Sequence, residues 1–289
     1  MANITTKADL YYPNTSAIDN DFIGFSFMGK PHTYFGISRV SDGSRYNEQM
    51  LPGFQDKSAQ MPGSDYTLYW ESFYNTRTWT LNIAFDYMTD INMSEFRKYF
   101  STKNLGELTF NERTYTIGSV TKPIHWLAKI QAPPQLKYIC FDENGQRIYK
   151  GEGTIQFVAY YPYGMSELQT LATSAAGTSI TNSGEIDMEW SIKILKPQSS
   201  STAFVIKDEV TANDNIRILR FDNGIDLKTG DTHFLVSSKT NLVEGVDTNG
   251  NKTGNVYNQF ITAGDFFKIP VGTSTFFGGG DLYYNFLYL

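Results

Sequence analysis

Three histidines are the side chains of this chain best suited to proton transfer or metal binding. None of His32, His125 and His233 has a second His or a Cys at the spacing of a metal-ligand pair. His32 lies in a segment with Pro and Gly, His125 precedes a tryptophan, and His233 begins an apolar run. We therefore expect three ordinary structural histidines, no catalytic residue, no metal site and no cofactor.

A second candidate for ligand binding is the polar run between Asp247 and Asn255. Asp247, Asn249 and Asn251 match the alternating oxygen ligands of a calcium loop. The glycine that such a loop requires is Lys252, however, and its bidentate glutamate is Asn258. The run is therefore better explained as a hairpin tip rich in Asn and Gly.

Other catalytic and binding motifs give equally weak signals. The chain has no Gly-x-Ser-x-Gly elbow and no Walker loop. The run Gly278-Gly279-Gly280 precedes a predicted strand, so it predicts a turn or bulge and no phosphate cradle. A hydrolase built on two carboxylates distant in sequence stays open as a function class.

Sugar binding is the main alternative function that a β-rich chain of this kind suggests. An exposed aromatic ring can stack on a sugar, and Trp190 is the candidate in the second half. Trp190 alternates in phase with four apolar residues, Ile186, Met188, Ile192 and Ile194, which places it on the buried face of a strand. The His-x-Asn-Pro-Arg and Trp-x-x-Glu patterns of sugar-binding galectins are absent.

The composition favours an all-β protein. The 289 residues include 21 Phe, 19 Tyr and 24 Gly, and aromatic residues suit pleated, half-buried surfaces. The net charge is −6 and no basic stripe is present, which argues against nucleic-acid binding. No apolar run is long enough for a membrane span, and we expect neither membrane insertion nor a secretory signal. Cys140 is the single cysteine, so no intrachain disulfide can form.

In the first half, the period of the apolar residues predicts strands and one helix. Alternation from Trp79 to Tyr87 predicts a strand with one buried face, and the stretch from Tyr66 to Tyr74 is its expected antiparallel partner, with Asn75 in the turn. Met93, Phe96 and Phe100 predict a helix from Met93 to Thr102, begun by a capping box of Asn92 and Glu95. The sequence then predicts a hairpin from Glu107 to Val120 that turns at Asn111-Glu112. Pro133-Pro134 predicts an extended backbone that leads into the next strand.

The middle of the chain predicts a domain boundary. Asn144-Gly145 signals a type I′ hairpin, and a strand through Ile155, Phe157, Ala159 and Tyr161 ends at Pro162. A run of small and polar residues follows. We therefore predict a first domain at residues 1–164, a connector at 165–184 and a second domain at 185–289, with a further turn at 222–224.

Several segments in order resemble the distal tail proteins of long-tailed bacteriophages. They are the stretch FIGFSFMGKPHTYFGISRVSDGSRY from Phe22 to Tyr46, the aromatic pair of segments from Tyr66 to Tyr87, the junction KGEGTIQFVAYYPYG from Lys150 to Gly164, and a Gly-Asp-Phe-Phe turn with a Tyr-rich end. None contains a chemically obligatory residue, so the ordered set carries the resemblance.

The resemblance implies a structural virion protein at the tail tip, made in the cytoplasm of the host bacterium, and no enzyme. It implies an N-terminal β-sandwich or split-barrel domain with one helix, which forms a hexameric ring continuing the tail tube. It also implies a C-terminal galectin-like β-sandwich that holds the baseplate or host-adsorption apparatus. The expected partners are the tail tube protein, the tape-measure protein and the tail-associated hub or lysin. The alternative is a carbohydrate-binding receptor module of a virion or cell surface. The interface residues stay unassigned.

Overall fold

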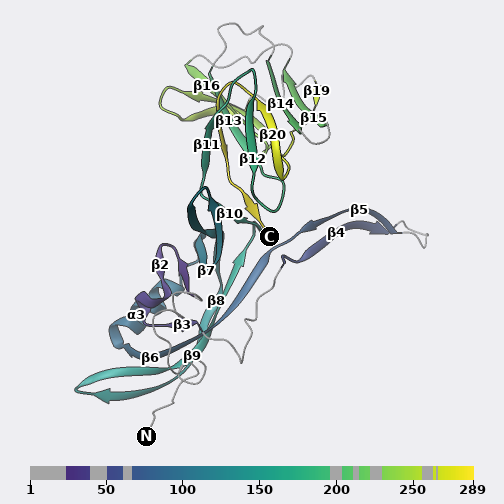
Figure 1. Ribbon diagram of the computed structural model, residues 1–289. Helices are drawn as coiled ribbons and strands as arrows, with labels where there is room; N and C mark the ends of the chain where they lie inside the picture. Colours follow the sequence, from purple (N-terminus) through teal and green to yellow (C-terminus); the bar gives the residue numbers. More distant parts are fainter. Residues whose placement is uncertain are drawn as a thin grey trace. The chain divides into compact units, whose positions relative to one another are not determined.

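The computed structural model describes residues 24–39, 51–60, 67–195, 204–210, 215–221, 230–255, 263–264 and 266–289. Nearly all of its elements are strands, so the predicted mainly β fold is confirmed (Figure 1). Contacts along the chain group it into two compact units, Met1–Gly164 with Leu289, and Met165–Tyr288. No helix among the described residues has the length and apolar character that a membrane span requires.

The first unit is built on one antiparallel sheet with the strand order β2-β1-β7-β8-β9-β6-β3. These strands are β1 (Phe25–Phe27), β2 (Lys30–Pro31), β3 (Ser38–Arg39), β6 (Arg77–Thr89), β7 (Gly106–Ile117), β8 (Val120–Glu143) and β9 (Gln146–Ala159). A short 3₁₀ helix, η1 (His32–Phe35), follows β2, and helix α3 (Asp90–Phe100) follows β6. The segment from Phe22 to Tyr46 lies partly outside the described residues.

The hairpin predicted at Asn144-Gly145 is present and joins β8 to β9. Asn144 has a φ of 54° and Gly145 a φ of 79°, as a type I′ turn requires. Glu143 pairs with Gln146 across the turn, and Asp142 Oδ1 accepts a hydrogen bond from the Gly145 N–H at 2.9 Å. The strand itself ends at Ala159, two residues earlier than Tyr161.

The turn predicted at Asn111-Glu112 is wrong. β7 continues through these residues, and the reversal occurs at Gly118 and Ser119, where Gly118 has a φ of 61°. The register of β7 against β8 shifts between Thr109 and Thr114, so the polar residues that resembled a turn form an irregularity within the strand.

The Pro133-Pro134 pair lies inside β8 and does not begin a new strand. The register of β8 against β9 shifts between Ala132 and Gln135, which accommodates two residues without N–H donors. Just beyond, β8 comes unusually close to β9. A Cβ atom on Gly151 would lie 2.2 Å from the carbonyl oxygen of Lys137, and one on Gly153 2.3 Å from that of Gln135. These two glycines therefore permit the close approach.

The strand predicted from Trp79 to Tyr87 is present as the central part of β6. Trp79, Leu81, Ile83 and Phe85 are buried, as the alternation predicts. The register shifts between Phe85 and Met88, however, which exposes Tyr87 and buries Met88. A bulge reverses the phase of the pattern, and the sequence gives no sign of it.

The segment from Tyr66 to Tyr74 does not pair with β6, which corrects a second prediction. It contains β5 (Thr67–Tyr74), which pairs with β4 (Phe54–Gln60) in a separate two-stranded sheet. Asn75 lacks the positive φ of a tight turn, unlike Asn144, and its N–H donates to the Gly53 carbonyl at 2.6 Å. The chain therefore runs on from β5 towards β6 without reversing (Figure 1).

Helix α3 is present, but it begins three residues before the predicted start and ends at Phe100. Its N-cap is Thr89, whose hydroxyl accepts from the Asn92 N–H at 3.3 Å, so the predicted Asn92–Glu95 capping box is not used. The predicted apolar face is correct, since Met93, Phe96 and Phe100 are buried. Phe100 lies 5.2 Å from Phe35 between ring centroids, which joins the helix to η1.

The second unit is a sandwich of two antiparallel sheets. One has the order β11-β21-β13-β16-β17-β18 and the other β12-β20-β14-β15-β19. Trp190 of the first sheet and Phe276 of the second lie 5.3 Å apart between ring centroids. The strands of the two sheets are β11 (Gln169–Ala172), β12 (Thr178–Asn182), β13 (Trp190–Leu195), β14 (Phe204–Val210), β15 (Asn215–Phe221), β16 (Asp231–Ser237), β17 (Leu242–Asp247), β18 (Lys252–Asn255), β19 (Ala263–Gly264), β20 (Gly272–Phe277) and β21 (Asp281–Tyr284). Two short strands outside these sheets, β10 (Gly164–Met165) and β22 (Leu287–Tyr288), pair with each other.

The stretch at 165–184 differs from the predicted connector, because it contains β11 and β12. Each lies at the edge of one sheet, where hydroxyl-bearing residues can face water. The C-terminal segment also belongs to this unit: the Phe286 carbonyl accepts from the Ser166 N–H at 3.0 Å and the Leu287 carbonyl from the Glu185 N–H at 2.8 Å. The glycines at 278–280 form the turn between β20 and β21. The turn predicted at 222–224 lies outside the described residues.

Candidate assembly surfaces

The three histidines occupy three separate structural positions. His32 is buried beside Phe25, with its Nδ1 3.3 Å from the Phe25 backbone nitrogen. His125 lies within β8 opposite Thr109, and His233 lies within β16, where its Nδ1 is 2.9 Å from the Thr232 hydroxyl. In the ranges that the structure describes, no three His, Cys, Asp or Glu side chains gather where they could hold a metal ion.

The polar run at Asp247 forms the hairpin tip that the sequence predicts. Asp247 Oδ1 accepts from the N–H groups of Asn249 and Asn251, each at 2.8 Å. Hydrogen bonds from Asn251 lower the pKa of the Asp247 carboxyl. The carboxylate thus accepts its hydrogen bonds within its own turn. Asn258, at the position of the glutamate of a calcium loop, lies outside the described residues.

Trp190 is buried, as the sequence predicts. Its side chain is 1% exposed, and its indole N–H donates to the Phe267 carbonyl at 2.8 Å. A ring in this position supports the sandwich core and presents no face to a sugar.

A first candidate surface is the ribbon formed by β4 and β5. The described side chains of β4, at 54–58, are all exposed, although they point alternately to the two faces. Phe54 is 65% exposed and Phe73, on the other face, is 44% exposed. Phe54 pairs with Tyr74 across the ribbon, with ring centroids 5.0 Å apart. A two-stranded sheet that exposes aromatic side chains on both faces is suited to pack against another molecule.

A second candidate surface is the end of the β8–β9 hairpin. Every residue at 137–147 is exposed, including Tyr138, Ile139 and Phe141. At its base, the Tyr149 hydroxyl donates to Asp90 Oδ1 at 2.5 Å, which joins the hairpin to the start of α3. The hydrogen bond to this carboxylate, with burial, raises the pKa of Tyr149.

A cleft of about 350 Å³ lies between α3 and the proline-containing part of β8. Its lining is mainly apolar and comprises Phe96, Arg97, Phe100, Ser101, Pro133, Pro134, Leu136 and Tyr138. Arg97 Nη2 donates to the Tyr138 hydroxyl at 3.2 Å, so the guanidinium of α3 is held against β8 at this cleft. The helix ends with two cations, Arg97 and Lys98, in its last turn.

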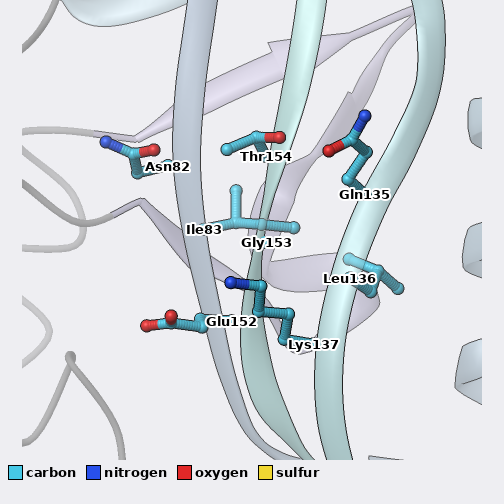
Figure 2. A pocket seen from close by; sticks show the side chains of 8 residues that line it. All are labelled: Asn82, Ile83, Gln135, Leu136, Lys137, Glu152, Gly153 and Thr154. Atoms are coloured by element: carbon cyan, nitrogen blue, oxygen red, sulfur yellow. The ribbon is translucent and has the colours of Figure 1, made fainter.

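A second hollow, of about 380 Å³, lies on the face of the sheet where β6, β9 and β8 run side by side (Figure 2). Asn82, Thr154 and Gln135 pair in one row across these three strands, and Glu152 and Lys137 pair in the next. Five of its eight lining residues are polar, with one charge of each sign from Glu152 and Lys137, and the other three are Ile83, Leu136 and Gly153. Such a face is compatible with contact to water or to a polar partner.

The β4–β5 ribbon and the α3–β8 cleft were not predicted from the sequence. The segment from Phe54 to Gln60 lacks the apolar alternation that reveals a half-buried strand, and its described side chains, at 54–58, are exposed on both faces. The only signal in the sequence is the pair Pro52-Gly53 before an isolated Phe54.

Comparison with known proteins gives structural matches but no sequence match. No protein-family model and no curated protein matches the sequence. The Dit protein of phage SPP1, described as a paradigm of the hub of the adsorption apparatus in phages that infect Gram-positive bacteria, is 11% identical, with a TM-score of 0.58 over 92% of this chain and 99% of the other. The chain has the fold of a phage hub protein.

Two baseplate structures of phage P2 also match the chain. One is the activated conformation with Ca, at 10% identity, a TM-score of 0.44, and coverage of 92% of this chain and 98% of the other. The other is the activated conformation with Sr, at 9% identity, a TM-score of 0.41, and coverage of 91% and 97%. The hub fold itself spans both units of the chain, since the SPP1 match covers nearly all of it.

Proposed function

We propose that this chain is a distal tail protein that forms a hexameric ring at the end of a phage tail tube and acts as the hub of the tail tip. The observation that carries the proposal is the match to the SPP1 Dit protein, which covers 92% of this chain and 99% of that hub protein. The sequence resemblance to distal tail proteins, which was drawn from separate segments, points to the same role.

The mechanism is assembly and involves no chemical reaction. A ring needs a heterologous contact, in which two different surfaces of one copy meet the complementary surfaces of its two neighbours. The first unit carries the two exposed ribbons and the apolar cleft, so we assign ring formation to it. We assign the second unit, as a galectin-like sandwich, to the attachment of the adsorption apparatus.

The proposed neighbours in the virion are the tail tube protein, the tape-measure protein and the tail-associated hub or lysin. The test is addition of the purified chain to tails from a phage that lacks its own distal tail protein. The chain is expected at the tip, where antibody labelling in the electron microscope would locate it. Labelling along the tube or no labelling would contradict the proposal.

The carbohydrate-binding alternative has less support. Its sequence candidate, Trp190, is buried and donates its N–H within the core. A glycan array or titration with host cell-wall polysaccharide separates the two functions. Specific binding that is lost on substitution of an exposed aromatic residue would favour the alternative.

A further inference from the structure

The side chain of Lys30 ends among three aromatic rings of the first unit. Its ammonium nitrogen lies 4.1 Å from the ring centroid of Tyr34, 5.1 Å from that of Tyr99 and 5.8 Å from that of Phe35. A cation over the face of an aromatic ring, within about 6 Å of its centroid, is attracted by the negative charge of that face. We call Tyr34, Phe35 and Tyr99 the aromatic cage.

Two walls of the cage are held in place by the fold. Phe35 belongs to η1, is 1% exposed and packs against Phe100 of α3. Tyr99 belongs to α3, and its hydroxyl donates to the Phe27 carbonyl, with the Met28 carbonyl oxygen 3.1 Å away. The ring centroids of Phe35 and Tyr99 are 4.9 Å apart and their planes are inclined at 42°, so these two rings form a fixed corner.

The third wall opens the cage to solvent. Tyr34 is 50% exposed, and its ring meets that of Phe35 at 82°, with the centroids 5.0 Å apart. Lys30 itself is half-buried. A lysine side chain is flexible and its ammonium is strongly hydrated, so water competes with the rings for it. Rotation of the Lys30 side chain is therefore enough to empty the cage, without movement of the backbone.

The Lys30 ammonium fills the cage incompletely. It lies close to the ring of Tyr34, while the centroids of the other two rings are more than 5 Å away. A trimethylammonium group carries the same charge on a larger and less hydrated surface, and its methyl groups extend towards all three rings. Cages of this kind are the usual means by which proteins recognise quaternary ammonium ligands such as choline.

We propose that the aromatic cage is a binding site for a quaternary ammonium group of the choline type, and that Lys30 occupies the site until such a group displaces it. The same group is present on phosphatidylcholine headgroups and on polymers substituted with phosphocholine, and the cage accepts either. The inference goes beyond the proposed hub function and does not depend on ring formation.

A second lysine of the first unit provides an internal comparison. The Lys129 ammonium lies 4.9 Å from the ring centroid of Tyr160, which is 58% exposed. In the part of the chain that the structure describes, this ammonium lies over one ring. A single exposed ring attracts a cation weakly. Lys129→Ala is therefore the matched control for Lys30→Ala, because each removes a lysine from a tyrosine but only the second leaves a three-walled cage.

Titration of the full-length protein with choline chloride tests the proposal, with saturation-transfer difference NMR of the choline methyl protons as the readout. We expect saturable binding to the wild type. Lys30→Ala should bind choline at least about fivefold more tightly, because the competing ammonium is gone. Lys129→Ala should bind like the wild type. The uncharged analogue 3,3-dimethylbutan-1-ol, in which carbon replaces the choline nitrogen, should give no saturable signal.

Tyr34→Leu tests the exposed wall of the cage. Leucine keeps an apolar side chain at this exposed position but removes the ring. Combined with Lys30→Ala, it should weaken choline binding at least about fivefold relative to Lys30→Ala alone.

Two further arms distinguish the sources of the ligand. Sedimentation of the protein with phosphatidylcholine vesicles, but not with phosphatidylglycerol vesicles, indicates a lipid headgroup. Capture by a soluble polymer that carries phosphocholine, without binding to vesicles, indicates a surface polymer.

Three results would overturn the inference. They are no saturable choline binding to the wild type, equal binding of the uncharged analogue, and binding to Lys30→Ala that is no tighter than to Lys129→Ala. Each leaves the proposed hub function standing, because ring formation is measured separately.

Discussion

Trp79 and Trp126 meet in the core of the first unit with ring centroids 5.5 Å apart and planes inclined at 65°. The guanidinium carbon of Arg77 lies 5.4 Å from each of the two ring centroids, and the Arg77 side chain is fully buried. Because Trp79 belongs to β6 and Trp126 to β8, the pair spans the sheet across β9. The sheet from which the ribbons extend is therefore held together by an aromatic cluster around one buried cation.

Replacement of Trp126 by Ala should destabilise the first unit by about 3–5 kcal/mol, because it opens a large cavity beside Trp79 and Arg77. The measurement is the denaturant midpoint of the transition assigned to the first unit. Leu105→Ala, at a site that is 49% exposed, serves as the control and should change the midpoint little. Equal effects of the two substitutions would contradict the assignment of Trp126 to the core.

Gly145→Ala should loosen the end of the β8–β9 hairpin by roughly 1–2 kcal/mol, because a non-glycine residue is disfavoured at a φ of 79°. No atom lies within 4 Å of the added Cβ, so the effect comes from the backbone alone. Hydrogen exchange of the tip amides should become about 5–30 times faster. Asn144→Gly should leave these rates nearly unchanged, and a large effect of that substitution would argue against the type I′ turn.

Thr89→Ala should weaken the start of α3 by about 1 kcal/mol, because the Asn92 N–H loses its acceptor. Thr89→Ser retains a hydroxyl and should restore most of the stability. Thermal unfolding followed by circular dichroism measures the difference. Should Asn92→Ala prove more damaging than Thr89→Ala, the cap predicted from the sequence would be correct and the observed cap wrong.

The second unit should show a pH dependence that originates at Asp208. Burial raises the pKa of its carboxyl, and the neighbouring Arg217 offsets part of this shift. The native state therefore retains this proton at pH values where the unfolded chain has lost it. Its contribution to stability is complete below the ordinary pKa of an aspartate and is lost as the pH rises through the raised value.

The measurement is the melting temperature of the second unit against pH for the wild type and Asp208→Asn. The wild-type value minus the variant value should fall as the pH rises through this window. A difference that is constant or grows with pH would show that the pKa is not raised.

The sequence predicts strands reliably where one face of the strand is buried. Alternation correctly places Trp79, Leu81, Ile83 and Phe85 in the core, and Trp190 in the core of the second unit. The pattern fails at Tyr87 and Met88 because a bulge adds one residue, and neither residue type signals a bulge.

The β4–β5 ribbon and the α3–β8 cleft are hidden from the sequence for a different reason. The described side chains of β4, at 54–58, are exposed on both faces, so no apolar period marks the strand. The prediction that β5 pairs with β6 assumed that the chain reverses at Asn75. The backbone at Asn75 lacks the positive φ of a tight turn, and the residue type alone does not reveal this. The cleft combines a helix with a strand that follows it only after β7, and the fold alone brings Phe96 and Pro134 together.

Mass photometry of the purified full-length protein across a concentration series tests the central claim most directly. The account predicts a discrete species of six copies of the 32.7 kDa chain, about 196 kDa, which negative-stain images resolve as a six-fold ring. A protein that remains at 32.7 kDa at the highest concentration and shows no ring would contradict the account.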